Sequence, residues 1–347
     1  MRNVIVFAGA GASKAVDPQA YPTTVEFFER LPPEVKNDTL FALLTKHLRR
    51  AVAGSPAIDI EQVLWALQEL QTFLDAVTNP HSVPGWFLQD SRLLQPISLT
   101  SNFNNLTENA PRVLEVVHRL RHAIDTQVYD LYGRVPSEEQ ILTNWLRLLD
   151  TLVTSNVRVD IFTTNYDRII EVALRHVRGS SVVRVDTGRR DEDVERYLDD
   201  RVWTESSTRS TGEVGLLTKL HGSVDWSWDL ARERIFISDP LFKGDHRRHV
   251  ILYPGFKGVP DRPPFNYFHS YFASRLALVD HIIFIGFAFR DEYINDMLQR
   301  FTAPRAIVTV VNPVEVKSPF AAEVQHIAAP FAADAVKQVL QRIEMAA

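Results

Sequence analysis

The sequence predicts an α/β protein built on an open parallel β-sheet with a large helical insertion. The first observation is a series of short apolar runs, several of which are followed by glycine, asparagine or histidine. Continuous apolar runs of this kind are typical of strands buried on both faces of a parallel sheet. The second observation is a long stretch after the first run whose apolar residues recur at helical spacing. The predicted strands are Val4–Ala8, Val157–Thr163, Val182–Val185, Leu216–Leu220, His281–Phe287 and Ala306–Val311.

The composition narrows the classes of protein to consider. The chain has 347 residues, 45% hydrophobic and 10% aromatic, enough for one large domain with an insertion or for two domains. A net charge of −5 argues against nucleic-acid binding by the whole chain. The absence of cysteine excludes disulfides, thiolate zinc sites and cysteine nucleophiles. With no apolar run near 20 residues and no signal-peptide pattern, we predict a cytoplasmic protein without a membrane span.

The helical insertion is predicted from three segments with apolar residues at helical spacing, Ile60–Leu74, Val113–Leu131 and Ile141–Val153. The last of them opens with a capping-box pattern at Ser137–Gln140. We therefore expect a sheet domain made of residues 1–30 and 155–347, and a helical insertion domain of residues 31–154.

Two other segments are predicted to be irregular. Asn79–Asn109 is rich in proline, serine and asparagine and is typical of a long surface loop. Thr187–Gly212 contains the charge-dense segment Arg189–Arg196 and the polar run Ser206–Thr211. A solvated helix followed by a loop is one interpretation of this segment, and a lid or partner contact near His221 is another.

A glycine-containing turn follows the first predicted strand directly, with the sequence Gly9, Ala10, Gly11, Ala12 and Ser13. Glycine has no Cβ, so the backbone N–H groups of such a turn can approach a phosphate closely. The spacing differs from the six-residue dinucleotide fingerprint. The turn is therefore a candidate phosphate-binding element, with Ala12 and Ser13 as donors to a pyrophosphate.

Further polar or glycine residues follow other predicted strands, namely Thr164, Asn165, Asp167, His221, Gly222, Gly286 and Asn312. Ligands of an open parallel sheet bind beyond the carboxyl ends of its strands. We therefore expect these residues to converge on one site, although they lie far apart in the sequence.

Two of these side chains have the chemistry of a catalytic site. Asn165 can donate and accept hydrogen bonds, which suits it to hold a ribose hydroxyl or to position a water, although asparagine is also a preferred helix cap. His221 can act as a general base near neutral pH, although histidine is also common as a buried core residue. Gly222 beside it is expected to leave space for a ligand next to the ring. Arg290 and Asp291 are interpreted as a helix start, with Asp291 as the cap and no chemistry assigned to Arg290.

The order and content of these motifs resemble the sirtuin-like superfamily, and most closely its cysteine-free bacterial branch that cleaves NAD in antiphage defence. Gly9–Ser13 is similar to the family's opening phosphate loop. Thr164–Asp167 is similar to its Thr-Gln-Asn-x-Asp element, with threonine at position 164 where sirtuin deacylases carry glutamine. His221–Gly222 resembles the catalytic His-Gly pair. Gly286 and Val311–Asn312 resemble the later elements that hold the adenosine half of NAD.

The resemblance implies a Rossmann-like fold that binds NAD as a substrate, with Asn165 and His221 as catalytic residues. It implies that Asp167 accepts a hydrogen bond from the nicotinamide carboxamide, although an acid at a helix start is also favoured by the helix dipole. It implies that Asn312 contacts the adenosine ribose, with a plain strand-end turn as the alternative.

The chain also departs from sirtuin deacylases, which follow the glycine loop with Gly-Ile-Pro-Asp-Phe-Arg and carry a four-cysteine zinc module. The corresponding stretch here is Tyr21–Val25, and without cysteine no zinc is expected. Water then becomes the natural nucleophile, and we expect an NAD⁺ glycohydrolase that releases nicotinamide and ADP-ribose and depletes NAD when triggered. The relatives imply a homo-oligomer, with a DNA-translocating ATPase or an Argonaute-like protein as partner.

Three other functions remain open at this point. A sensor would bind NAD or ADP-ribose without turnover. A protein deacylase would form product only with an acyl-lysine substrate. A nuclease would require a metal site, and the histidines show no His-Glu-x-x-His or other metal-ligand spacing.

Overall fold

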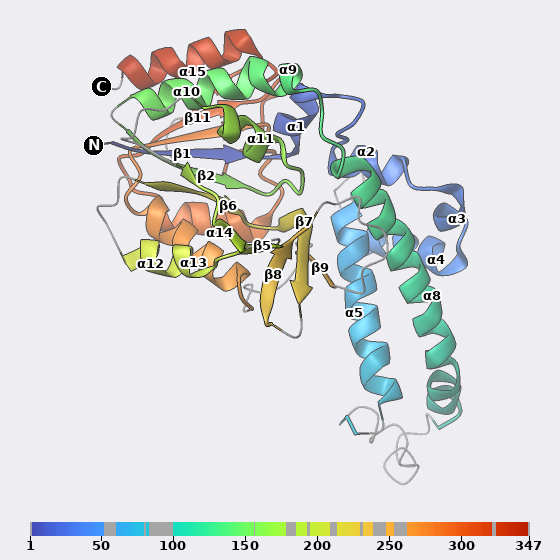
Figure 1. Cartoon of the computed structure of the whole chain (residues 1–347). Coiled ribbons are helices and arrows are strands. Elements are labelled where there is room, and N and C mark those ends of the chain that lie inside the picture. The colour runs from blue at the N-terminus through green and yellow to red at the C-terminus, as the bar shows by residue number, and fades with distance from the viewer. Residues whose placement is uncertain are drawn as a thin grey trace. The chain divides into compact units, whose positions relative to one another are not determined.

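The computed structural model describes residues 2–51, 60–79, 81–82, 100–155, 157–177, 185–192, 195–208, 214–229, 232–238, 248–252, 262–320 and 324–345. The chain divides into two compact units (Figure 1). One consists of Met1–Thr23, Tyr129–Leu252 and Phe256–Ala347, and the other of Thr24–Val128 with Tyr253–Gly255.

The first unit is built on a seven-stranded sheet with the order β12-β11-β10-β1-β2-β6-β3, and all of its strand pairs are parallel. Its strands are β1 (Arg2–Ala8), β2 (Val157–Thr163), β3 (Val185–Asp186), β6 (Gly215–Lys219), β10 (His281–Ile285), β11 (Ile307–Val311) and β12 (Val324–Ile327). The chain leaves β1 for β2 on one side and later returns to β10 on the other. The sheet is therefore doubly wound in the Rossmann manner, with its switch point between β1 and β10. The predicted open parallel sheet is confirmed.

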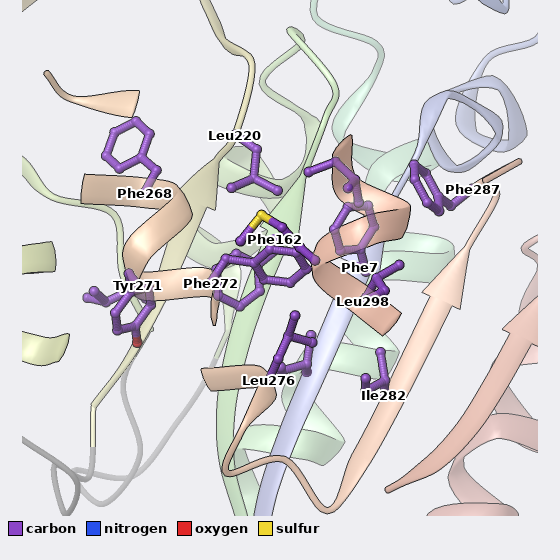
Figure 2. Close-up of a cluster of buried hydrophobic side chains, with 14 of the residues drawn as sticks. Phe7, Phe162, Leu220, Phe268, Tyr271, Phe272, Leu276, Ile282, Phe287 and Leu298 are labelled. Atoms are coloured by element: carbon purple, nitrogen blue, oxygen red, sulfur yellow. The ribbon is translucent and has the colours of Figure 1, made fainter. Parts of the chain in front are cut away.

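Helices cover both faces of this sheet (Figure 1). Helices α10 (Arg147–Thr154) and α15 (Ala333–Met345) lie on one face, and α13 (Phe265–Leu276) and α14 (Glu292–Phe301) lie on the other. The core under α13 and α14 is aromatic, because β1, β2 and α13 all direct phenylalanine rings into it (Figure 2). The Phe162 and Phe272 ring centroids are 4.6 Å apart, and those of Phe7 and Phe272 are 5.6 Å apart. Such pairs each contribute roughly 0.5–1.5 kcal/mol beyond the burial of their area.

A buried ionic cluster lies at the middle of β2. The Asp160 carboxylate accepts hydrogen bonds from Arg275 Nε at 2.8 Å, from Arg158 Nε at 3.2 Å and from the Leu216 backbone N–H at 3.0 Å. The Tyr271 hydroxyl donates to the same carboxylate. These contacts join β2 to β6 and to α13, so the cluster connects the sheet to the helix layer.

The first unit also contains a five-stranded antiparallel sheet with the order β4-β5-β8-β7-β9. Its strands are β4 (Arg189–Glu192), β5 (Glu195–Leu198), β7 (Gly222–Asp229), β8 (Arg234–Ile237) and β9 (Arg248–Ile251). The helix expected for the charge-dense segment is therefore wrong, because Arg189–Glu192 and Glu195–Leu198 are paired antiparallel strands; residues 193 and 194 lie outside the described residues. Arg189 turns inward to Glu171 and Asp225, at 3.1 and 2.8 Å, whereas Asp191 and Arg196 pair on the exposed side. Helix α12 (Arg201–Thr208) covers the first half of the polar run, and residues 209–211 lie outside the described residues.

The second unit is helical. It contains α2 (Thr24–Glu29), α3 (Pro33–Lys36), α4 (Thr39–Ala51), α5 (Ile60–Thr78) and most of α8 (Thr100–Tyr132). The surface loop expected over Asn79–Asn109 is wrong from Thr100 onward, where α8 has begun; residues 80 and 83–99 lie outside the described residues. None of the described helices is long and apolar enough to cross a membrane.

The helical unit is shorter than the predicted insertion of residues 31–154. Helix α9 (Glu138–Ile141), a π-helical segment (Leu142–Leu146) and α10 belong to the sheet unit. Within them, the Asn144 side chain donates to the Phe331 carbonyl at 2.8 Å, and the Trp145 ring packs 4.9 Å from the Phe331 ring. These contacts explain why the sheet unit resumes before residue 155. The predicted capping box at Ser137–Gln140 is confirmed.

Candidate functional site

The predicted site residues lie along the carboxyl edge of the parallel sheet. The strands β11, β10, β1, β2 and β6 are consecutive neighbours, and the turns that follow them are joined by backbone hydrogen bonds. Gly9 N donates to Ile285 O at 2.9 Å, and Gly286 N donates to Val311 O at 2.9 Å. Thr164 N donates to Ala8 O at 3.3 Å. The structure thus brings the five strand-end motifs to one edge of the sheet, as the strand pattern predicted.

Asn165 belongs to a short hydrogen-bond chain that joins the ends of β1 and β2. Its Nδ2 donates to Gly9 O at 2.9 Å and to Ser13 Oγ at 2.8 Å. The Ser13 hydroxyl in turn donates to Asp167 Oδ2 at 2.6 Å. Asn165 is therefore not the cap of the following helix, which was the alternative to a site role. Both amide hydrogens have protein acceptors, so Oδ1 is the group of this side chain that can still accept a hydrogen bond.

Asp167 is buried and engages the protein with both carboxylate oxygens. Besides the bond from Ser13, Oδ1 accepts the backbone N–H of Ile169 at 3.0 Å, at the start of α11 (Ile169–His176). Burial raises the pKa of the Asp167 carboxyl above its ordinary value, although Lys219 and the Ser13 hydroxyl oppose the shift. These contacts support the interpretation of Asp167 as a helix-start acid.

The turn after β1 and the turn after β10 pack closely against each other at the switch point, and this contact explains their glycines. A Cβ on Gly9 would lie 2.7 Å from Gly286 O, and one on Gly11 would lie 2.8 Å from the Cα of Gly286. Gly286 has φ +59°, and its Cβ would lie 2.3 Å from Ala12 N. The N–H groups of Gly9, Gly11 and Ala12 all donate to backbone carbonyls within the protein. Phosphate approach was the reason expected for these glycines, whereas in the structure they permit the contact between the two turns. Ala10 opens the short helix α1 (Ala10–Val16) beside them.

His221 lies in the turn between β6 and β7 and is 3% exposed. Its Nε2 lies 3.1 Å from Oδ2 of Asp291, while its Nδ1 is buried and has no hydrogen-bond partner among the described residues. The neighbouring Gly222 has φ +84°, and a Cβ there would lie 2.1 Å from the Val250 carbonyl oxygen. The close approach of β9 therefore requires glycine at this position, a reason that the sequence did not reveal.

Asp291 was predicted only as a helix cap, and that prediction is confirmed. Its Oδ1 accepts the backbone N–H of Ile294 at 3.0 Å at the start of α14. Burial alone would raise the pKa of the Asp291 carboxyl. The hydrogen bond and charge of His221 and the Ile294 N–H outweigh burial, so the net pKa lies below the ordinary value.

A buried charge network behind Asp167 was not predicted. Lys219 Nζ pairs with Glu171 Oε1 at 3.1 Å and also donates to the Asp167 carbonyl. Arg189 joins Glu171 to Asp225, whose pKa is held below its ordinary value because Arg189 and Lys219 outweigh the effect of burial. A lysine at the end of an apolar strand, two residues before His221, was the available signal. Buried lysines are rare unless they are paired.

Asn312 and Thr164 are placed at the same edge. Asn312 Nδ2 donates to Phe287 O at 3.4 Å, and its Oδ1 accepts from Val314 N at 3.5 Å. These bonds favour the plain strand-end turn that was the alternative for Asn312. Among the residues that the structure describes, no group of three or more histidine or acidic side chains could hold a metal ion.

Comparison with known proteins finds a family model that matches less than half of the chain. A family model described as a SIR2-like domain matches residues 159–307, a range that includes Asn165, His221, Gly286 and Asp291. Over this part, the chain is similar to SIR2-like proteins. No curated protein matches the chain.

Solved structures with some similarity to the chain are Sir2 homologues. One, a mutant bound to 2′-O-acetyl ADP-ribose, is 11% identical with a TM-score of 0.43, over 99% of this chain and 92% of that one. Another, a Sir2 homologue in complex with NAD, is 13% identical with a TM-score of 0.41, over 99% of this chain and 90% of that one.

Proposed function

We propose that this chain is an NAD⁺ glycohydrolase that cleaves NAD⁺ to nicotinamide and ADP-ribose. The observation that carries the proposal is the pair formed by Asn165 and His221 at the ends of the neighbouring strands β2 and β6. Each side chain keeps one acceptor atom without a partner among the described residues, Oδ1 of Asn165 and Nδ1 of His221. The SIR2-like match over residues 159–307 supports NAD as the substrate.

The reaction breaks the bond between C1′ of the ribose and the pyridinium nitrogen. The electron pair of that bond leaves with nicotinamide, which becomes neutral, and positive charge develops on the ribose. Water adds to C1′ and loses a proton to His221, and the products are ADP-ribose, nicotinamide and a proton. Asn165 holds a ribose hydroxyl or the water through Oδ1, and His221 acts as the general base through Nδ1.

The remaining predicted residues form the proposed binding surface for NAD. The turn of Gly9, Ala10, Gly11, Ala12 and Ser13 lies at the switch point, where the pyrophosphate is expected. The other proposed contacts are Thr164, Asp167, Gly222, Gly286 and Asn312. No bound metal takes part in the proposed reaction.

We further propose a role in antiphage defence, in which assembly or a partner triggers NAD depletion in the cytoplasm. An NADase without control would deplete NAD in its own cell, so low basal activity is expected. The proposed assembly is a homo-oligomer, with an ATPase that translocates DNA or an Argonaute-like protein as the candidate partner.

The test is chromatography of NAD⁺ incubated with the purified chain, beside His221→Ala and Asn165→Ala. We expect nicotinamide and ADP-ribose in equal amounts with the unsubstituted chain and neither product with the variants. NAD⁺ that binds but stays intact would support a non-catalytic sensor instead. Product that forms only when an acyl-lysine peptide is added would support a deacylase.

A further inference from the structure

Asp291 uses its two carboxylate oxygens for different partners. Oδ1 accepts the Ile294 N–H at 3.0 Å and caps α14, whereas Oδ2 lies 3.1 Å from His221 Nε2. The side chains of Asp291 and His221 are 10% and 3% exposed. The cap alone requires one oxygen, and serine or asparagine could supply it. The second contact therefore needs its own explanation.

The contact with Asp291 defines the protonation of the imidazole. An ionised carboxylate only accepts hydrogen bonds, so Nε2 of His221 must carry the hydrogen. In the neutral ring the lone pair is then on Nδ1, which is the atom that is buried without a partner among the described residues. A buried acceptor without a partner is costly. Because Nδ1 carries the lone pair and has no partner among the described residues, it is the atom of His221 that can receive a proton from a substrate or a water.

Residues 287–291, which lead to Asp291, are fixed by hydrogen bonds from two asparagine side chains. Phe289 adopts φ +53°, a left-handed conformation that is uncommon for a non-glycine residue. Its carbonyl accepts from Asn295 Nδ2 at 2.7 Å, and the Phe287 carbonyl accepts from Asn312 Nδ2 at 3.4 Å. A backbone strained in this way persists only where its surroundings define it, so the position of Asp291 is fixed before any ligand binds.

The other titratable groups near the pair lie on α13 and α14. Burial lowers the pKa of His269 to about 4, so this ring is neutral at pH 7, and its Nδ1 lies 2.8 Å from the Phe265 carbonyl oxygen. The Tyr293 ring packs 5.3 Å from the His269 ring, and burial, Asp291 and Asp296 raise the pKa of its hydroxyl. Asp291 is thus the carboxylate that contacts His221 within the described part of the chain.

We propose that Asp291 is the positioning residue of the site: it fixes the His221 ring with the Nδ1 lone pair available as the base, and it stabilises the imidazolium that forms when the proton is taken. This inference rests on the proposed glycohydrolase activity for its catalytic part. The arrangement of the imidazole itself is independent of that activity and can be measured separately.

The variant that isolates this role is Asp291→Asn. Asparagine keeps the shape and the helix cap, but its amide donates to Nε2 and moves the hydrogen of the neutral ring to Nδ1. We expect the turnover number to fall by about 10²–10⁴-fold with little change in KM.

The matched control is Asp296→Asn. Asp296 lies on the same helix and pairs with Arg300 at 2.7 Å on an exposed face, so the variant makes the same change of charge without touching His221. It should retain its turnover number and KM. An Asp291→Asn variant whose turnover number stays within about threefold of the unsubstituted chain would overturn the catalytic part of the proposal.

Nitrogen-15 NMR of histidine-labelled chain reads the tautomer directly, with His221→Ala used only to assign the signal. The expected result is hydrogen on Nε2 in the unsubstituted chain and on Nδ1 in Asp291→Asn. Hydrogen on Nδ1 in the unsubstituted chain would contradict the positioning role whether or not NAD⁺ is cleaved. If the tautomers are as expected but the chain never cleaves NAD⁺, the proposed function and the catalytic role of Asp291 fail while the structural assignment of the ring stands.

Discussion

Two of the buried polar clusters in the sheet unit, the Asp160 cluster and the His221–Asp291 pair, differ in how their hydrogen-bonding groups are used. The Asp160 cluster in the middle of β2 is saturated, since its carboxylate accepts from Arg158, Arg275, the Tyr271 hydroxyl and a backbone N–H. The His221–Asp291 pair at the strand ends is also largely buried, yet His221 Nδ1 has no partner among the described residues. Burial and charge therefore do not separate a structural cluster from a candidate catalytic one. These two clusters differ in hydrogen bonding, because the Asp160 carboxylate is fully used whereas His221 Nδ1 is not.

The largest predicted effect on stability is at the saturated cluster. Asp160→Ala removes the acceptor shared by two buried guanidinium groups, and we expect a loss of about 3–5 kcal/mol in the free energy of unfolding. Denaturant titration measures this loss. Asp296→Ala, which breaks an exposed pair with Arg300, should cost less than about 1 kcal/mol. Equal effects of the two substitutions would remove the distinction between buried and exposed clusters.

The next effect concerns the pH dependence of stability. Burial lowers the pKa of His281 from 6.5 to about 4, so the folded chain holds this ring neutral where the unfolded chain protonates it. The neutral ring therefore stabilises the fold fully above pH 6.5, and this stabilisation is lost as the pH falls from 6.5 to about 4. The loss in unfolding free energy amounts to about 3 kcal/mol at most. His281→Gln should flatten the fall in unfolding free energy over this window. A fall that stays equally steep over this window in His281→Gln would contradict the assignment.

A smaller effect is expected where the two turns interlock. Gly286→Ala places a methyl group 2.3 Å from Ala12 N at a backbone φ of +59°, so we expect a loss of about 2 kcal/mol in unfolding free energy. Because the turn after β10 leads to Asp291, NAD⁺ cleavage should fall by more than the loss of folded protein explains. Unchanged stability would show that the turns can separate without cost and that the edge is not rigid.

The sequence predicted the sheet well because its strands are buried on both faces. Continuous apolar runs such as Val4–Ala8 leave little ambiguity, and parallel order brings their carboxyl ends together. The antiparallel pair of strands β4 and β5 was missed because its inward residue is an arginine whose partners, Glu171 and Asp225, come from distant elements. A charged residue that points inward cannot be told from a solvated one by local pattern.

The strand pattern predicted that the candidate site residues lie at one edge of the sheet, but it did not predict their contacts. Asp291 was identified as a helix cap from local sequence, yet its contact with His221 depends on which strand ends lie near the start of α14. The glycines were identified from the sequence as special positions, but the backbone neighbours that require them were not. Gly9, Gly11 and Gly222 accommodate backbone atoms of Gly286 and Val250, and no local signal reveals such a neighbour.

The most direct test of the central claim compares nicotinamide release and unfolding free energy in three proteins: the unsubstituted chain, His221→Ala and Asp160→Asn. The account predicts that His221→Ala loses turnover by at least about 10²-fold while its unfolding free energy changes little. Asp160→Asn should lose stability and keep its turnover per folded molecule. If His221→Ala instead retains the rate of the unsubstituted chain, His221 is not the catalytic base, and the distinction between the two clusters fails.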